Sequence, residues 1–255
     1  MRLFALASLG AALALAQPAE RPDPPRSGSE FTGPDLRAMQ ADDFANPAML
    51  WVERGAAAWR EKAGPAGKSC GDCHGEASAS MKGVAARYPS VDAQTGALLD
   101  LEGRINACRA GKQRAAALAP ESPELLALSA YVARQSRGMP VAFSSDPRMK
   151  PALERGRALY HQRIGQMNLA CTHCHDRSWG RRLYSETISQ GQPNGWPAYR
   201  VSWESIGSLA RRLRACFYGV RAQMPDYGSR DLLDLEVYLA WRADGLAMEA
   251  PAVRR

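Results

Sequence analysis

The stretches Cys70-Gly-Asp-Cys73-His74 and Cys171-Thr-His-Cys174-His175 decide how this sequence folds. Both follow the pattern C-x-x-C-H, and they stand 101 residues apart in a chain of 255. The same offset joins Glu53-Arg54-Gly55 to Glu154-Arg155-Gly156. Blocks that recur in one order at one spacing indicate a duplicated domain.

Each copy continues in the same way after its C-x-x-C-H motif. Arg104-Ile-Asn-Ala-Cys108 matches Arg212-Leu-Arg-Ala-Cys216 at an offset of 108 residues. A final helix then follows, because Glu124 to Tyr131 matches Asp231 to Tyr238 and both segments are amphipathic. The residues expected on the buried faces of these helices are Leu125, Leu128 and Val132 in the first copy and Leu232, Leu235 and Leu239 in the second.

The C-x-x-C-H pattern is the attachment motif of c-type haem, in which two thiols bond to the porphyrin and the histidine binds iron. Zinc would need two more ligands at each site, and only His161 and His173 are spare. We therefore predict two covalently bound haem c groups. The attachment and ligand residues are Cys70, Cys73 and His74 in the first copy and Cys171, Cys174 and His175 in the second.

The predicted fold is all-α, with two tandem cytochrome c domains. The first domain covers residues 47–147 and the second covers residues 148–255. Residues 17–46 are polar and rich in proline, and they predict an extended N-terminal arm.

A third cysteine in each copy is the favoured second axial ligand of iron. Cys108 and Cys216 stand at equivalent places downstream of the haem motifs, whereas the methionines do not repeat cleanly. A Cys108–Cys216 disulfide and two structural thiols are the alternatives. A thiolate favours ferric iron and is also a nucleophile, so this ligand predicts sulfur chemistry beside electron transfer. The rival methionines are Met81, Met139, Met224 and Met248.

The N-terminus predicts export. Arg2 precedes an apolar stretch that ends at Ala14-Leu15-Ala16, so residues 1–16 are expected to be a secretory signal peptide cleaved near Ala16. The stretch is short for a membrane span, and no stable membrane insertion is expected of the mature, periplasmic protein. The net charge of +7 does not by itself predict a nucleic-acid partner, because haem propionates would offset part of it.

Two C-x-x-C-H domains, each followed by R-x-x-x-C, resemble the SoxA family of dihaem cytochromes over essentially the whole mature chain. The resemblance implies a heterodimer with a monohaem SoxX-type cytochrome c. It also implies an L-cysteine S-thiosulfotransferase activity, in which thiosulfate is oxidatively joined to a cysteine of a SoxYZ-type carrier and two electrons pass to haem c.

The resemblance further implies roles for single residues. The catalytic haem would be the C-terminal one, with His175 on one side and Cys216, as thiolate or persulfide, on the other. The N-terminal haem, between His74 and Cys108, would be non-catalytic.

Two arginines are candidates for binding thiosulfate. Arg212 lies four residues before Cys216, so both share one helical face, and guanidinium groups bind such anions well. A salt bridge from Arg212 to a haem propionate is equally open, because Arg104 stands at the matching place in the first copy. Family analogy also favours Arg242, on the final helix.

Two other functions remain open from the sequence. One is a thiosulfate dehydrogenase that makes tetrathionate, since such enzymes are also dihaem cytochromes with a cysteine-ligated haem. The other is a plain dihaem electron carrier, with Met224 or another residue on iron.

Overall fold

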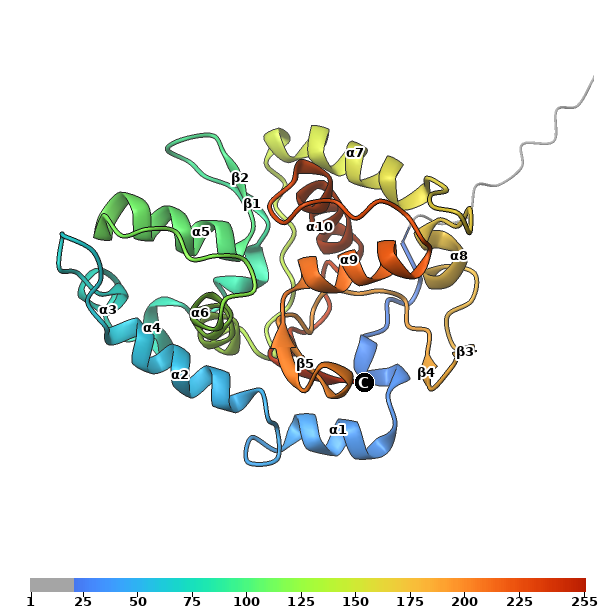
Figure 1. Ribbon diagram of the computed structural model, residues 1–255, viewed down its shortest axis with the longest axis horizontal. Coiled ribbons are helices and arrows are strands. Elements are labelled where there is room, and N and C mark those ends of the chain that lie inside the picture. The colour runs from blue at the N-terminus through green and yellow to red at the C-terminus, as the bar shows by residue number, and fades with distance from the viewer. Residues whose placement is uncertain (1–20) are drawn as a thin grey trace, which may run out of the picture.

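The computed structural model describes residues 21–255, so the predicted signal peptide and the first residues of the arm lie outside the described part (Figure 1). Within residues 21–255, no helix is long and apolar enough to cross a bilayer. The α-helices are α1 (Pro34–Ala41), α2 (Met49–Arg60), α3 (Cys70–His74), α4 (Ala77–Ser80), α5 (Leu101–Cys108), α6 (Pro123–Arg134), α7 (Lys150–His161), α8 (Cys171–His175), α9 (Leu209–Gly219) and α10 (Arg230–Arg242).

Each half of the fold is built around one pair of packed helices, α2 with α6 and α7 with α10 (Figure 1). A glycine lets each pair approach closely. A Cβ atom on Gly55 would stand well under 3.0 Å from the Ala127 carbonyl, and one on Gly156 would stand equally close to the Asp234 carbonyl. The repeated E-R-G sequence is therefore the contact point of both helix pairs.

The predicted buried faces of the two final helices are confirmed. Leu125, Leu128 and Val132 on α6 are at most 3% exposed, and their counterparts on α10 are at most 4% exposed. Ser122 begins α6 as a cap, since its hydroxyl accepts from the Leu125 backbone N–H at 3.3 Å.

The all-α prediction misses several short strands. They are β1 (Ser90–Val91), β2 (Leu98–Leu99), β3 (Arg182–Leu183), β4 (Glu186–Thr187), β5 (Ala198–Arg200), β6 (Ser205–Gly207) and β7 (Ala252–Arg254). The central strand β5 pairs antiparallel with β6 and parallel with β7 at the C-terminus. Strands of two or three residues show no alternating pattern, so only their partners in space reveal them.

The same hairpin precedes the helix that carries the third cysteine in each copy. β1 and β2 pair Ser90 with Leu99, and β5 and β6 pair Ala198 with Gly207, at the same offset of 108 residues. Each hairpin follows a cis proline, Pro89 or Pro197. The duplication therefore extends through a loop in which the two sequences share little.

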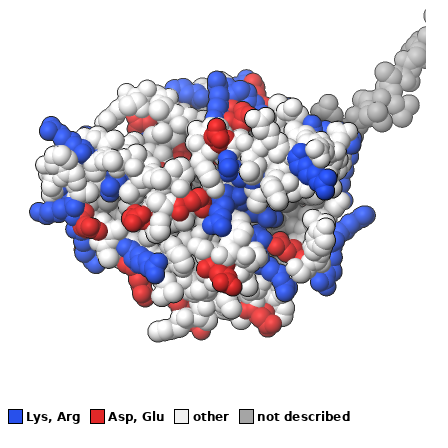
Figure 2. Space-filling model, viewed as in Figure 1, with Lys and Arg blue, Asp and Glu red and all other residues white. Residues whose placement is uncertain are grey.

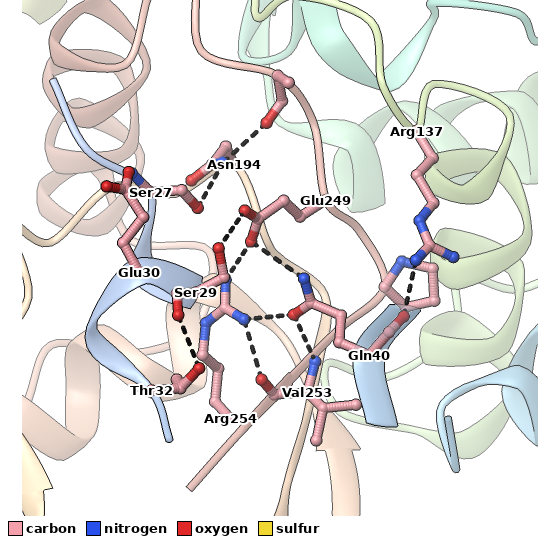
Figure 3. Close-up of polar contacts among 12 residues, drawn as sticks. Ser27, Ser29, Glu30, Thr32, Gln40, Arg137, Asn194, Glu249, Val253 and Arg254 are labelled. Atoms are coloured by element: carbon pink, nitrogen blue, oxygen red, sulfur yellow. Dashed lines mark hydrogen bonds and ion pairs between the residues drawn. The ribbon is translucent and has the colours of Figure 1, made fainter. Parts of the chain in front are cut away.

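The N-terminal arm was predicted to be extended. In its described part it also forms a 3-10 turn at Gly28–Phe31 and then the helix α1. Figure 3 shows it bound to the C-terminal segment. Ser29 donates to Glu249 at 2.5 Å, and Gln40 accepts from Arg254 at 2.5 Å. Arg254 in turn forms an ion pair with Glu249 at 2.6 Å. These contacts close the arm against β7.

Candidate functional site

His175 and Cys216 come together from α8 and α9, although they are far apart in sequence. The Nδ1 of His175 donates to the Ser189 carbonyl at 2.8 Å, which fixes the orientation of the imidazole. The loop after α8 packs tightly there, since a Cβ on Gly191 would lie 3.0 Å from the imidazole. An oriented imidazole with a carbonyl behind it is the arrangement expected of an iron ligand.

The Cys216 thiol faces that imidazole and is poised to ionise. Burial alone would raise its pKa, but the charge of Arg212, a hydrogen bond with His175 and the charge of Arg200 together lower the pKa to about 7. A sulfur with this pKa is a substantial thiolate near neutrality, which is the form that binds metal and attacks electrophiles.

The two motif cysteines lie beside Cys216 but in a different electrostatic state. Burial, followed by the nearby Cys216 sulfur, raises the pKa of Cys171 to about 12 and raises the pKa of Cys174. Three sulfurs and one oriented imidazole gathered at one place fit the donor set of a covalently attached, His/Cys-ligated haem.

The arginines beside Cys216 are Arg212, as predicted, and Arg200, which the sequence reasoning missed. Arg200 ends β5, is 6% exposed and forms an ion pair with Glu186 at 2.7 Å. Its guanidinium also lies 5.0 Å from the centre of the Trp203 ring. Burial and the charge of Arg212 lower the pKa of Arg200, which indicates that the two guanidinium groups are near each other.

Arg242 lies against the segment that carries His175. It is 2% exposed, donates to Asp176 at 2.6 Å and lies over the Tyr160 ring at 4.5 Å. Tyr160 donates to the same carboxylate at 2.9 Å. Because Asp176 directly follows His175, these contacts anchor the end of α8. A direct contact between Arg242 and substrate stays a prediction.

In the first copy, Trp59 and Cys108 lie close to the haem motif. The Trp59 ring lies tilted beside the His74 imidazole, with ring centres 5.7 Å apart, and its indole N–H donates to the Gly75 carbonyl at 2.9 Å. Burial raises the pKa of Cys70; the nearby charge of Arg109 lowers it, and the nearby sulfur of Cys108 raises it. The third cysteine therefore lies close to the haem motif in this copy too.

The structure also bears on two alternatives left open by the sequence. All six cysteines are free, so Cys108 and Cys216 form no disulfide here. Met248 packs in an apolar cluster with Ala243 and Ala250, and Met224 is 42% exposed. Cysteine thus stays the favoured distal ligand over these methionines.

A cavity of about 100 Å³ lies elsewhere, between the two halves. Three carboxyl groups line it, from Asp100, Glu102 and Glu236. Burial raises the pKa of Glu102 to about 8 and raises the pKa of Glu236 well above its usual range. The cavity contains neither haem-motif histidine and belongs to the packing between the halves.

Taken together, a mainly helical fold and paired C-x-x-C-H sites define a c-type cytochrome. The family model described as "SoxA/TsdA, cytochrome c domain" matches residues 54–141. The subunit SoxA of L-cysteine S-thiosulfotransferase from Pseudaminobacter salicylatoxidans is 43% identical over 230 residues, covering 90% of this chain and 80% of that protein.

Two further relatives indicate the same family. The corresponding subunit from Rhodovulum sulfidophilum is 37% identical over 236 residues, covering 92% of this chain and 82% of that protein. The crystal structure of SoxXA from P. pantotrophus superposes with a TM-score of 0.87 at 35% identity, covering 91% of this chain and 87% of that one. The chain belongs to the SoxA family.

Proposed function

We propose that the protein is the SoxA subunit of an L-cysteine S-thiosulfotransferase. It oxidatively conjugates thiosulfate to a cysteine of a SoxYZ-type carrier, in the periplasm, as a heterodimer with a SoxX-type cytochrome c. The observation that carries the proposal is the Cys216 site, where His175 and the guanidinium groups of Arg212 and Arg200 gather around the third cysteine of the second copy. The curated relatives with this name support it along 90% of the chain.

Two haem c groups are part of the proposal, one in each of the domains 47–147 and 148–255. Cys70 and Cys73 would hold the first haem between His74 and Cys108. Cys171 and Cys174 would hold the second between His175 and Cys216. When bound, haem iron supplies the acceptor for electrons and the metal that keeps the distal sulfur ionised.

In the proposed reaction, Arg212 binds the sulfonate end of thiosulfate and leaves the sulfane sulfur facing Cys216. The Cys216 thiolate forms a sulfur–sulfur bond with the sulfane sulfur, an oxidation that releases two electrons, for which the haem c groups of the complex would be the acceptors. The carrier thiolate then attacks that sulfane sulfur, which breaks its bond to Cys216 and regenerates the thiolate. Thiosulfate ends on the carrier as an S-thiosulfonate, and atoms and charge balance.

The role of Arg212 gains support from a comparison of the two copies. Arg104, its counterpart, donates to Tyr88 at 3.1 Å and pairs with the Asp92 carboxylate. Among residues 21–255, the Arg212 side chain makes no hydrogen bond or ion pair. A guanidinium without a carboxylate beside a nucleophilic sulfur is suited to an anionic substrate.

The haem proposal predicts two haems per chain in protein matured with the cytochrome c assembly system. Replacing Cys171 and Cys174 with serine should leave one, because the first site keeps its own cysteines. Pyridine haemochrome absorbance per mole of protein, with denaturing mass spectrometry, measures the number. One haem in the unaltered protein would contradict the duplication of the site.

The functional proposal predicts that the protein, with its SoxX-type partner and a SoxYZ-type carrier, adds one thiosulfate to the carrier cysteine. Mass spectrometry of the carrier and reduction of an added c-type cytochrome measure the two products. Tetrathionate made from thiosulfate without carrier would instead indicate a thiosulfate dehydrogenase. Electron transfer without either product would indicate a plain carrier.

A further inference from the structure

The matched hairpins allow the two copies to be compared residue by residue near the third cysteine. Because β1–β2 and β5–β6 pair in the same register at an offset of 108, Asp92 and Arg200 occupy equivalent places. Arg104 and Arg212, on the helices that follow, are equivalent at the same offset. The same position therefore carries an acidic residue, Asp92, in the first copy and a basic residue, Arg200, in the second.

In the first copy, the charge of the arginine is neutralised at this place. The Arg104 guanidinium pairs with Asp92, whose side chain is only 9% exposed. Thr95 donates to the same carboxylate at 2.7 Å, and these bonds, with that from Arg104, hold the pKa of Asp92 well below its usual range. The arginine of this copy is neutralised and has no charge left for a ligand.

In the second copy, positive charge is in excess at the same place. Arg200 replaces the acid, so two guanidinium groups lie near Cys216 and near each other. Glu186 pairs with the terminal Nη2 of Arg200. The Nε of Arg200, however, is buried and has no hydrogen-bond partner in the described chain. A buried guanidinium with an unsatisfied N–H beside a second positive charge is costly unless an anion joins them.

We propose that Arg200 is a substrate-binding residue that forms, with Arg212, a two-guanidinium receptor for the sulfonate group of a sulfur oxyanion. Glu186 and the Trp203 ring hold Arg200 in place from β4 and from the turn after β5. A doubly charged oxyanion satisfies both guanidinium groups, whereas the Asp92 of the first copy would repel it. This inference rests on the proposed function and extends its substrate site.

The direct test is equilibrium binding of thiosulfate to the complete haem-loaded complex without carrier, by calorimetry. Arg200→Gln should weaken binding by roughly 10- to 100-fold, because a charge-assisted hydrogen bond to a buried anion is lost. Arg200→Lys should weaken it less, since the charge remains but the planar fork does not. Sulfate, a dianion that cannot react, should follow the same order.

Arg211→Gln is the matched control. Arg211 lies over the same Trp203 ring at 4.1 Å, but its ion pair is with Glu121 at 3.8 Å. We expect this change to alter thiosulfate affinity less than about twofold, as for a surface charge. In turnover with carrier, Arg200→Gln should raise the KM for thiosulfate more than it lowers kcat.

The inference is overturned if Arg200→Gln binds thiosulfate as the unaltered protein does. If Arg200→Gln fails to retain haem, Arg200→Lys decides: weaker binding supports the receptor, and unchanged binding overturns it. Failure of the unaltered complex to bind or conjugate thiosulfate would instead contradict the proposed function itself, so the two failures are distinguishable.

Discussion

Cys216→Met should abolish conjugation of thiosulfate to the carrier while both haems stay attached. Thioether attachment needs only Cys171 and Cys174 at this site, and methionine can still bind iron. The nucleophile, however, is lost, because a thioether sulfur carries no ionisable proton. We expect the rate to fall by a factor on the order of 10³ or more, as when other enzymes lose their nucleophile.

Cys108→Met is the control for this change, since it makes the same replacement at the equivalent position of the first copy. Conjugation should survive there, because that haem is proposed to be non-catalytic. Unchanged turnover in Cys216→Met would mean that the distal sulfur only tunes the haem potential. Carrier mass and haem content, measured on the same preparations, separate these outcomes.

The salt dependence of turnover offers a supporting readout on the same preparations. The sequence before Cys216 is basic, with Arg211, Arg212 and Arg214, and Figure 2 shows basic side chains over the part of the face where Figure 1 draws α9. Positive charge around Cys216 favours both the thiolate form of its sulfur and the approach of an anion. Added salt should slow the approach of the anion more than it weakens the thiolate.

The second large effect concerns the helix contact that builds each half. Gly156→Ala should destabilise the protein by about 3 kcal/mol or more, because its Cβ would overlap the Asp234 carbonyl on α10 and lie 2.9 Å from the Tyr238 Cβ. Backbone atoms cannot move aside as a flexible side chain can. Urea unfolding of the haem-loaded protein, followed by circular dichroism, measures the loss.

Gly33→Ala is the matched control, because nothing lies within 4 Å of the Cβ it would add. Its stability should change by about 1 kcal/mol or less, because Gly33 is exposed and alanine is only a weaker N-cap for α1. Gly55→Ala should resemble Gly156→Ala, since its Cβ would meet the Ala127 carbonyl of α6 in the same way. A stable Gly156→Ala protein would show that α7 and α10 can separate without cost.

Several features of the fold could be read from local sequence alone. The covalent chemistry of C-x-x-C-H depends on neighbouring residues, so the attachment sites follow from short motifs. The period of 3.6 residues placed Leu125 and Leu232 on buried faces, as the structure confirms. The E-R-G repeat indicated the duplication, but only the structure shows that its glycine is the contact point of each helix pair.

Other features depend on partners that are distant in the chain. The strand β7 forms only because β5, about fifty residues earlier, offers an edge to pair with. The arm folds over Glu249 and Arg254, which sequence patterns cannot connect to Ser29 or Gln40 (Figure 3). Short-range periodicity carries no information about such contacts.

The sequence by itself determined the kind of cofactor, the duplication, the candidate ligands and the family to which the chain belongs, because these reside in motifs and their order. Only the tertiary structure decided the electrostatics of the two equivalent sites. Asp92 and Arg200 look unrelated in sequence, and a shared hairpin register makes them counterparts. Charge acts through space, so one arginine is neutralised and the other is left open to an anion.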